Sequence, residues 1–313
     1  MKKIWITGCF GFIGHHLAEY INGNLDDASV YGIGRASQCE TLLPWQFISD
    51  ISPDSLDKLF NFSGSYPDII YHCAGTGSVG VAQQNPHEDF LSTVCSVSIL
   101  LEWVRVKSPG TRIIVMSSAA IYGSGYSGPI SESDKTAPAS VYGYNKLLVE
   151  QLCNSYVNNF GLDIIVTRLF SVYGVGLKKQ LLFDVCLKLL KLNNGDSIEV
   201  FGTGCEIRDW INIRDVVSTL IEIGYSDRFS ERVVNIGTGY KKQVLDLVSL
   251  VVKSWGFNGS SVPVIFNGIS RVGDPKSLLS DNTLRSSICH HDDIPLADGV
   301  DEYVNWFKEC YGK

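Results

Sequence analysis

Two ionisable side chains stand four residues apart in the segment 142–146, and their types suggest acid–base chemistry. Tyr142 and Lys146 fall on one face if that segment is helical. A phenol titrates near pH 10, so it is a poor acid–base catalyst at neutral pH unless a cation lowers its pKa. A shift to pH 7 takes roughly 4 kcal/mol of differential stabilisation. Because Lys146 supplies an ammonium at the right spacing, the pair predicts proton transfer by Tyr142.

A hydroxyl upstream of this pair is expected to assist it. The apolar run 113–116 is typical of a buried strand, and it ends at Ser117 and Ser118. Ser118 is therefore expected to hold the reacting oxygen by a hydrogen bond while Tyr142 moves the proton.

Glycines recur every third residue near the start of the chain. Gly8, Gly11 and Gly14 follow the apolar run 4–7. Glycine tolerates a strained turn and lets the backbone approach a diphosphate, and the helix that follows points its free N–H groups at that anion. The spacing predicts a dinucleotide site. The charge of an oxidised nicotinamide would then add to that of Lys146 in lowering the pKa of Tyr142.

The first half of the chain alternates short apolar strands with amphipathic helices. The expected strands are 3–7, 29–33, 69–73, 112–117 and 164–168, and the expected helices are 12–22, 53–62, 87–107 and 143–160. Alternation of this kind predicts an α/β fold with a Rossmann-type, doubly wound parallel sheet and helices on both faces.

The rhythm changes after Phe170. The expected helices there are 181–193, 215–224, 243–255 and 300–310, separated by glycine-rich turns. We therefore expect a dinucleotide-binding domain over 1–170, rejoined by parts of 211–240. The remainder, 171–313, is expected to form a smaller mixed α/β lobe at the carboxyl edge of the sheet, where ligands of such sheets bind.

Composition excludes several classes of function. The 313 residues are 45% hydrophobic and 19% charged, which is a globular profile, and the net charge of −7 comes with no long basic run. We therefore expect no nucleic acid and no membrane as a partner. Nine cysteines without a C-x-x-C pair are typical of reduced thiols, so a cytoplasmic protein is expected.

Many ordered motifs along nearly the whole chain make a family resemblance specific. They are Thr7–Gly14, Asp50–Ile51, His72–Gly75, Ser117–Gly123, Tyr142–Lys146, Arg168–Gly174, Gly202–Gly204 with Arg208–Asp209, and Arg271–Asp274. With these motifs the chain resembles the extended short-chain dehydrogenase/reductases that act on nucleotide sugars. The resemblance implies a Rossmann lobe, a catalytic set of Ser118, Tyr142 and Lys146, and hydride transfer at the sugar ring.

The resemblance also implies which residues hold the nicotinamide cofactor. They are Gly8, Gly11, Phe12, Ile13 and Gly14 of the glycine turn, Asp50 and Ile51 around the adenine, Cys73, Ala74 and Gly75 after the third strand, and Tyr142, Lys146 and Phe170. Members that use NAD carry an acidic residue at the end of the second strand, whereas Arg35 follows that strand here. A guanidinium grips a 2′-phosphate, and Ser37 adds a hydroxyl. We therefore expect NADP(H), with NAD(H) as the alternative.

The residues after Ser118 exclude some of the reactions that the family catalyses. Sugar 4,6-dehydratases of this family carry an Asp-Glu pair there, whereas this chain has Ala119-Ala120, which cannot shuttle protons. The glutamate usual in decarboxylases is also missing. We expect an NADP(H)-dependent oxidoreductase that reduces an NDP-4-keto-6-deoxyhexose. The alternative is a UDP-glucose 4-epimerase-like enzyme with tightly bound NAD, which the segment 72–86 resembles. A non-catalytic NADP(H) sensor is disfavoured because Tyr142 and Lys146 are both present.

A nucleoside-diphosphate sugar is the substrate that the resemblance implies. Its expected contacts are Ser78, Val79, Ser118, Ser171, Gln180, Leu181, Arg208 and Arg271. Arg208 and Arg271 match the arginines that bind the diphosphate in the family.

Two further expectations concern metals and assembly. The run 290–293 (His-His-Asp-Asp) is not expected to bind a metal, because adjacent histidines point apart. The helices near 87–107 and 143–160 carry more apolar residues than one sheet needs, among them Leu100, Leu101 and Val104. The family pairs these helices across a homodimer, so a homodimer is expected here.

Overall fold

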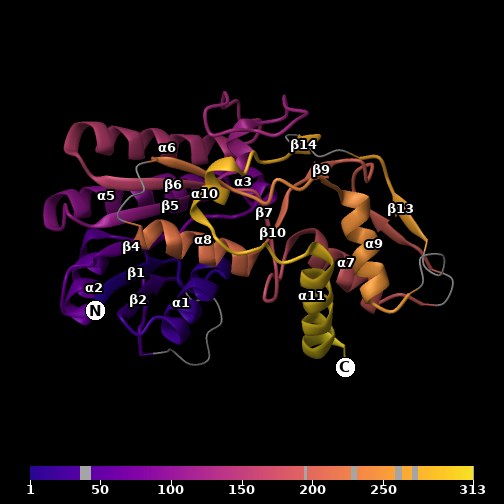
Figure 1. Cartoon of the computed structure of the whole chain (residues 1–313), viewed down its shortest axis with the longest axis horizontal. Coiled ribbons are helices and arrows are strands. Elements are labelled where there is room, and N and C mark those ends of the chain that lie inside the picture. The colour runs from indigo at the N-terminus through magenta and orange to yellow at the C-terminus, as the bar shows by residue number, and fades with distance from the viewer. Residues whose placement is uncertain (36–43, 194–195, 227–230, 258–262, 270–273, 313) are drawn as a thin grey trace. The chain divides into compact units, whose positions relative to one another are not determined.

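The structure divides into two compact units, which we call unit 1 and unit 2 (Figure 1). It is a computed structural model and describes residues 1–35, 44–193, 196–226, 231–257, 263–269 and 274–312. Unit 1 comprises Met1–Tyr122, Lys135–Leu169 and Val217–Val234, and unit 2 comprises Gly123–Asp134, Phe170–Val216 and Asn235–Lys313. The segment 123–134 thus belongs to unit 2, although the expected boundary at residue 170 had assigned it to the first domain.

A seven-stranded sheet forms the centre of unit 1. Its strands, in spatial order, are β3 (Gln46–Ile48), β2 (Ala28–Gly34), β1 (Lys2–Thr7), β4 (Ile69–His72), β5 (Arg112–Ser118), β6 (Asp163–Leu169) and β11 (Val233–Ile236). Each neighbouring pair from β3 to β6 is parallel. The order reverses between β1 and β4, and ligands of doubly wound sheets bind outside the carboxyl ends of the strands at that point. The predicted fold class is confirmed.

The central strands are nearly continuous apolar runs because both faces of the sheet are covered. Every residue of β4 is buried, and so are the five central residues of β5 and every residue of β6 after the first. On one face, Trp5 packs against Trp103 with ring centroids 5.4 Å apart. That face is covered by α2 (Pro53–Ser63), α5 (Ser96–Lys107) and α6 (Val141–Phe160), which Figure 1 shows beside the sheet.

The opposite face is covered by α1 (Phe12–Asn24) and by the part of α8 (Ile213–Tyr225) that belongs to unit 1. Tyr71 is fully buried there, and its hydroxyl donates to the Leu220 carbonyl oxygen at 3.2 Å. A Cβ atom at Gly224 would lie 2.1 Å from that hydroxyl oxygen, so this turn of α8 approaches the sheet only because residue 224 has no side chain.

Local signals set the ends of the helices in unit 1. Ser52 caps α2 in a reciprocal capping box with Ser55, and Gly64 ends the helix in the left-handed conformation. Ser140 caps α6 by accepting a hydrogen bond from the Gly143 amide, and Gly161 ends it. The cap at Ser140 fixes the first turn of α6, which carries Tyr142.

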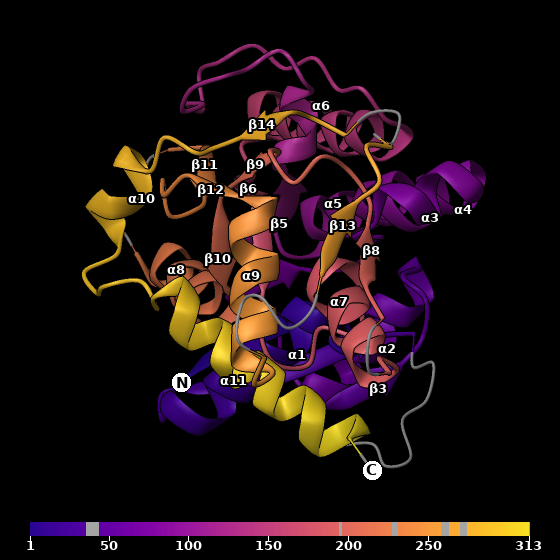
Figure 2. The ribbon, with the colours of Figure 1, turned by 90° about the vertical axis from the view of Figure 1, so that its right-hand side faces the viewer.

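Unit 2 is built from short strands and from helices that pack on one another (Figure 2). Its pairings are β7 (Ser171–Tyr173) with β10 (Trp210–Asn212), β8 (Ile198–Val200) with β13 (Val264–Phe266), and β9 (Ile207–Arg208) between β12 (Lys242–Gln243) and β14 (Ser277–Leu278). Its helices besides the start of α8 are α7 (Gln180–Leu190), α9 (Val244–Ser254), α10 (Thr283–Ile288) and α11 (Leu296–Tyr311). Phe307 of α11 is fully buried against Phe183 and Trp255.

A buried carboxylate organises the loops of unit 2. Asp209 is fully buried and accepts hydrogen bonds from the backbone amides of Thr238, Gly239 and Ser280 and from the hydroxyls of Thr238 and Ser280. These bonds satisfy the buried carboxylate and fix the chain next to Arg208.

The expected helix 87–107 is interrupted. It consists of α4 (Pro86–Phe90), a π-helical turn η1 (Leu91–Cys95) and α5, and the unexpected short helix α3 (Val79–Gln84) precedes it. Leu100, Leu101 and Val104 are fully buried within the chain, because α2 packs beside α5 and covers them. Their predicted role as a surplus apolar face is therefore wrong, and the homodimer stays a prediction. Among the residues that the structure describes, no helix combines the length and apolarity needed to cross a membrane.

A buried ion pair attaches α6 to the sheet. Glu150 receives two nitrogen atoms of Arg168, the closer at 2.8 Å, and the Ser117 hydroxyl at 2.5 Å. Arg168 also donates to the Tyr122 hydroxyl at 2.8 Å. Burial opposes the charge of Arg168, but Glu150 and Tyr122 raise its pKa above the usual value. One carboxylate thus links α6 to β5 and β6, one turn of helix beyond Lys146.

We predict that Glu150→Gln destabilises the protein by about 3–5 kcal/mol, because it leaves the Arg168 guanidinium buried without its counter-charge. Urea unfolding followed by circular dichroism measures the loss. Glu102→Gln is the matched control, since Glu102 pairs with Arg105 at 2.7 Å in an exposed position and its removal should cost nothing measurable. Equal losses in the two variants would contradict the prediction.

Candidate active site

The three predicted catalytic residues come together in unit 1. Ser118 ends β5, and Tyr142 and Lys146 lie in the first two turns of α6. Ser118 hydrogen-bonds the Tyr142 side chain, and its Oγ also accepts from the Ala120 amide at 3.2 Å. The Lys146 Nζ lies 5.8 Å from the centre of the Tyr142 ring and donates to the Met116 carbonyl oxygen at 2.8 Å.

The pKa of Tyr142 differs from the expectation. Burial raises it above its usual value, the hydrogen bond with Ser118 lowers it, and the charge of Asp89 raises it further. The expected lowering by Lys146 together with an oxidised nicotinamide stays a prediction, and in the structure the pKa is raised instead. The physical reason is desolvation, because a phenolate at this position would lose its hydration.

Lys146 is itself strongly affected by burial. Its side chain is 5% exposed, and burial lowers its pKa to about 8, although the charges of Asp89, Cys73 and Glu150 oppose the shift. With that pKa, Lys146 is charged in most molecules at pH 7. The site thus holds a cation at neutral pH and loses it in mildly alkaline solution.

The glycine turn fits a dinucleotide. Gly8 has a φ of 70°, and a Cβ there would lie 2.7 Å from the Ala74 amide nitrogen, so only glycine lets β1 and β4 meet at this point. A Cβ at Gly14 would lie 2.4 Å from the Gly8 carbonyl oxygen. Gly11 caps α1 without a side-chain hydrogen bond, so the amides of Phe12, Ile13 and Gly14 in the first turn remain available to an anion.

The segment after β4 lies beside that turn. Cys73 and Ala74 are partly buried, and the Cys73 amide donates to the Thr7 carbonyl oxygen at 3.0 Å. Gly75 has a φ of 120°, and a Cβ there would lie 3.2 Å from the Thr93 hydroxyl. Burial raises the pKa of the Cys73 thiol to about 12, so it is not a reactive nucleophile at neutral pH.

The predicted adenosine end is exposed. Arg35 follows β2, and its Nε lies 3.5 Å from an Asp50 carboxylate oxygen, with the two side chains 64% and 80% exposed. Ile51 is partly buried next to Asp50. Ser37 lies outside the described residues.

The two positions directly after Ser118 carry no proton-transferring side chain. Ala119 and Ala120 form the start of the short helix η2 (Ala119–Tyr122). The Ala120 carbonyl oxygen would lie 2.7 Å from a Cβ at Gly143, so the backbone of η2 touches the first turn of α6. The positions that would hold the acid and base of a dehydratase carry only methyl groups here.

The other predicted substrate contacts divide between the units. In unit 1, Ser78 caps α3 and Val79 is its first residue. In unit 2, Ser171 begins β7 and Leu181 lies in the first turn of α7, and Phe170, which was predicted to contact the cofactor, is buried.

Two of the predicted substrate contacts in unit 2, Gln180 and Arg208, have unusual surroundings. Gln180 has a φ of 67°, a conformation that side chains with a Cβ rarely adopt. Burial lowers the pKa of Arg208, while the charges of Asp274 and Glu206 oppose the shift. Its Nη1 donates to the Ile207 carbonyl oxygen at 2.8 Å. Arg271 lies outside the described residues.

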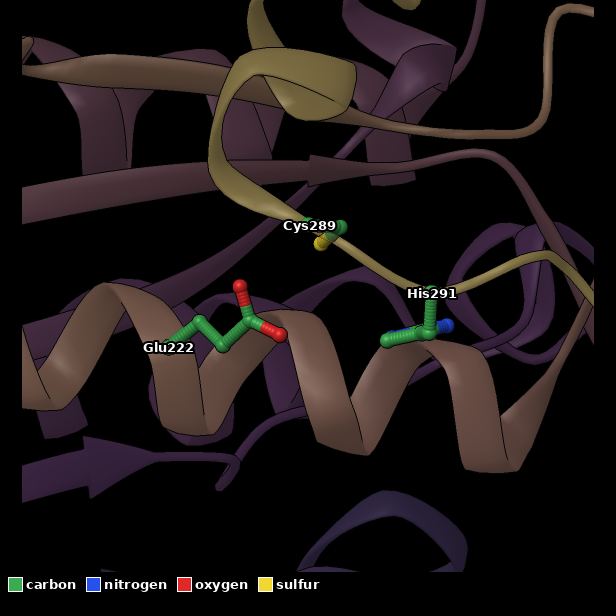
Figure 3. A group of neighbouring side chains, drawn as sticks. All are labelled: Glu222, Cys289 and His291. Atoms are coloured by element: carbon green, nitrogen blue, oxygen red, sulfur yellow. The ribbon is translucent and has the colours of Figure 1, made fainter.

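The run 290–293 contributes to structure through its last residue. Asp293 accepts two hydrogen bonds from the buried Arg285, at 2.5 and 2.9 Å. Figure 3 draws His291 and Cys289, which follow α10 in unit 2, together with Glu222 of the unit 1 part of α8. A cysteine and a histidine from one unit do not make a metal site, and we assign none.

Several residues around the predicted site carry no strong sequence signal. Glu150 lies four residues beyond Lys146, a spacing that places both on one face of α6. Thr93, Asn145 and Asp89 are buried polar residues that contact the site's elements, and nothing in their local sequence sets them apart.

A parallel sheet with a glycine turn at its switch point and a Ser/Tyr/Lys set beside it defines an extended short-chain dehydrogenase/reductase. The chain belongs to the NAD dependent epimerase/dehydratase family, whose sequence model matches residues 4–237. It is 27% identical over 324 residues to the uncharacterized UDP-glucose epimerase YtcB of Bacillus subtilis, covering 99% of both chains. It is 26% identical over 309 residues to a putative UDP-glucose 4-epimerase of Methanocaldococcus jannaschii, covering 97% of this chain and 98% of the relative.

Solved structures share the whole fold. The UDP-glucuronic acid 4-epimerase of Bacillus cereus, in complex with UDP-glucuronic acid and NAD, has a TM-score of 0.85 and 26% identity, over 99% of this chain and 100% of that one. The UDP-glucose 4-epimerase of Thermotoga maritima, solved with UDP-glucose, has a TM-score of 0.85 and 24% identity, over 98% and 99% of the two chains. The second likeness supports the fold alone.

We predict that Gly14→Ala weakens the binding of a nicotinamide dinucleotide at least about tenfold, or about 1.4 kcal/mol, because the added methyl group pushes α1 away from Gly8. Gly23→Ala in the same helix is the control, since a Cβ there meets nothing within 4 Å and alanine favours helix. Titration of dinucleotide fluorescence measures both. Unchanged affinity in Gly14→Ala would show that the turn does not hold the diphosphate.

Proposed function

We propose that this protein is a nucleotide-sugar 4-epimerase that uses a retained NAD. Relatives from Bacillus cereus and Methanocaldococcus jannaschii bear the names of 4-epimerases, and the Bacillus cereus structure contains NAD. They favour the alternative given in the sequence analysis over the ketoreductase that it preferred.

One observation of the site carries the choice of reaction. Around the Ser118 hydroxyl the proton-transferring group is Tyr142, and Ala119 and Ala120 supply none. A single acid–base group suffices to oxidise and reduce one carbinol carbon, whereas elimination of water needs a second acid and base. The site therefore fits chemistry confined to carbon 4.

The chain's own residues would work as follows. Tyr142 takes the proton of the sugar 4-hydroxyl while the hydrogen on carbon 4 leaves as a hydride, which produces a ketone. After the sugar has presented its opposite face, a hydride returns to carbon 4 and Tyr142 gives the proton back to the oxygen. When bound, the nicotinamide supplies the reversible hydride acceptor. Ser118 holds the oxygen by a hydrogen bond throughout, and no net reductant is consumed.

The residues at the adenosine end support NAD over NADP. A 2′-phosphate on Arg35 would also meet the Asp50 carboxylate, which lies 3.5 Å from the Arg35 Nε. A phosphate bound at Arg35 would bring a second anion to a guanidinium that already pairs with Asp50, and two like charges close together disfavour each other. A ribose 2′-hydroxyl, in contrast, donates to a carboxylate without a charge penalty.

The substrate we propose is a nucleoside diphosphate linked to a hexose. Arg208 supports this assignment, because its guanidinium is partly buried in unit 2 and matches the family's diphosphate-binding arginine. A diphosphate is well suited to a desolvated guanidinium, which binds phosphate oxygens in a bidentate manner.

The second candidate is reduction of a 4-keto sugar nucleotide by NADPH. It is favoured by one observation, that a cation rather than an acid follows β2 at Arg35. Reduction would use the same proton donor, Tyr142, but would consume one NADPH for each sugar.

We predict that the purified protein converts a UDP-hexose into its carbon-4 epimer without added coenzyme. Denaturing the protein should release NAD rather than NADP, as identified by mass spectrometry, because the residues around Arg35 disfavour a 2′-phosphate. One-for-one consumption of NADPH with a 4-keto sugar nucleotide, and no epimerisation, would establish the reductase instead.

We predict that Tyr142→Phe lowers kcat by at least about 100-fold, because general acid–base catalysis contributes that much or more. Its affinity for the dinucleotide should be retained, since the glycine turn is unchanged. Tyr144→Phe is the matched control, because Tyr144 lies two residues away on α6 with its side chain 56% exposed. If both variants keep full activity, Tyr142 is not the acid–base group.

A further inference from the structure

A carboxylate that the mechanism does not use is buried beside the catalytic helix. Asp89 is 1% exposed, although its neighbours Glu88 and Phe90 on α4 are exposed. Burying an ionised carboxylate is costly unless hydrogen bonds and charges compensate it. The burial of this carboxylate points to a role for which its charge is needed.

Asp89 connects two segments of the site. One of its oxygens accepts from the Asn145 amide nitrogen at 2.6 Å, and the other accepts from the Thr76 hydroxyl. Asn145 directly precedes Lys146 on α6, and Thr76 directly follows Gly75 of the predicted cofactor site. The carboxylate therefore joins the start of the catalytic helix to the loop after β4.

A further contact with Thr76 comes from the helical turn after α4. The π-helical η1 begins two residues after Asp89, and the Thr93 hydroxyl in it accepts a hydrogen bond from the Thr76 amide at 3.3 Å. Asp89 and Thr93 are four residues apart, a spacing that places both on one side of a helix, and both contact Thr76.

The charges around Lys146 single out Asp89. The groups that act on the ammonium are Asp89 of α4, Cys73 after β4 and Glu150 of α6, and the ammonium in turn lowers the pKa of His72. Burial holds Cys73 neutral, and Glu150 is matched by Arg168 at 2.8 Å. The hydrogen-bond donors of Asp89 are neutral side chains, so its charge is left to act on the lysine.

We propose that Asp89 is a positioning residue that fixes the start of α6 and supplies the buried counter-charge of the Lys146 ammonium. Its negative charge favours the protonated forms of both Lys146 and Tyr142. When that charge is removed, each group loses its proton at a lower pH. The lysine thereby becomes neutral closer to physiological pH, where a neutral amine attracts neither a phenolate nor a ribose hydroxyl as strongly.

The test is a titration of Lys146 in the ligand-free protein by NMR of the lysine side chains, with the signal assigned by its loss in Lys146→Met. The midpoint should lie at about pH 8 in the natural chain and lower in Asp89→Asn. Glu88→Gln removes the same charge from an exposed position next to Asp89 on α4 and should leave the midpoint unchanged.

A purely structural role for Asp89 would reduce stability without moving that midpoint, and this outcome would overturn the proposal. So would an equal shift in Glu88→Gln. If Asp89→Asn fails to fold, Asp89→Ser repeats the test with a smaller side chain, and Asp89→Glu should restore the midpoint because it restores the charge.

Kinetics supply a second measurement. The pH profile of kcat in Asp89→Asn should move to lower pH on both limbs, because Tyr142 and Lys146 both lose their protons earlier. This part rests on the proposed epimerase activity. The NMR titration needs no substrate, so it stands or fails independently of that activity.

Discussion

The buried ammonium of Lys146 is the constraint on which the site depends. Lys146 is 5% exposed, and the loss of hydration lowers its pKa to about 8. The side chain stays charged at neutral pH only because neighbouring polar and negatively charged groups stabilise it. The Met116 carbonyl oxygen accepts a hydrogen bond from Lys146 Nζ at 2.8 Å, and the charges of Asp89 and Glu150 oppose deprotonation of the ammonium. The lysine therefore cannot be understood apart from the strand and helices that hold these groups.

The architecture of unit 1 follows from the same need for a dry and rigid site. Helix α6 carries Tyr142 and Lys146 on its first turns and Glu150 on the next, and Glu150 ties the helix to β5 and β6 through Ser117 and Arg168. The helix cannot slide along the sheet without breaking a buried ion pair, which is far more costly than breaking a surface pair. The spacing between the Ser118 hydroxyl and the Tyr142 ring is thus set by contacts outside the site.

The sequence was sufficient to predict what local pattern determines. Continuous apolar runs gave β1, β4, β5 and β6, and the four-residue spacing gave Tyr142 and Lys146 on one helix face. The edge strands β3 and β11, of three and four residues, were missed, and only one residue of β3 is buried. The π-helical turn at 91–95 was missed because the apolar periodicity continues through it. Asp89 was missed because a charged residue on a helix is normally solvated, and its burial depends on Thr76 and Asn145 folding against it.

The raised pKa of Tyr142 is compatible with the proposed reaction, because the charge of the cofactor can shift it in each half-reaction. Burial and Asp89 raise the pKa of the phenol when no nicotinamide charge is added to that of Lys146. An oxidised nicotinamide brings such a charge, and a reduced one does not. Under the proposed function, Tyr142 would therefore be deprotonated and able to accept a proton while the sugar is being oxidised, and protonated and able to donate one while the ketone is being reduced. Each half-reaction would leave Tyr142 in the protonation state that the other half needs, so a single phenol could serve both without exchanging its proton with water.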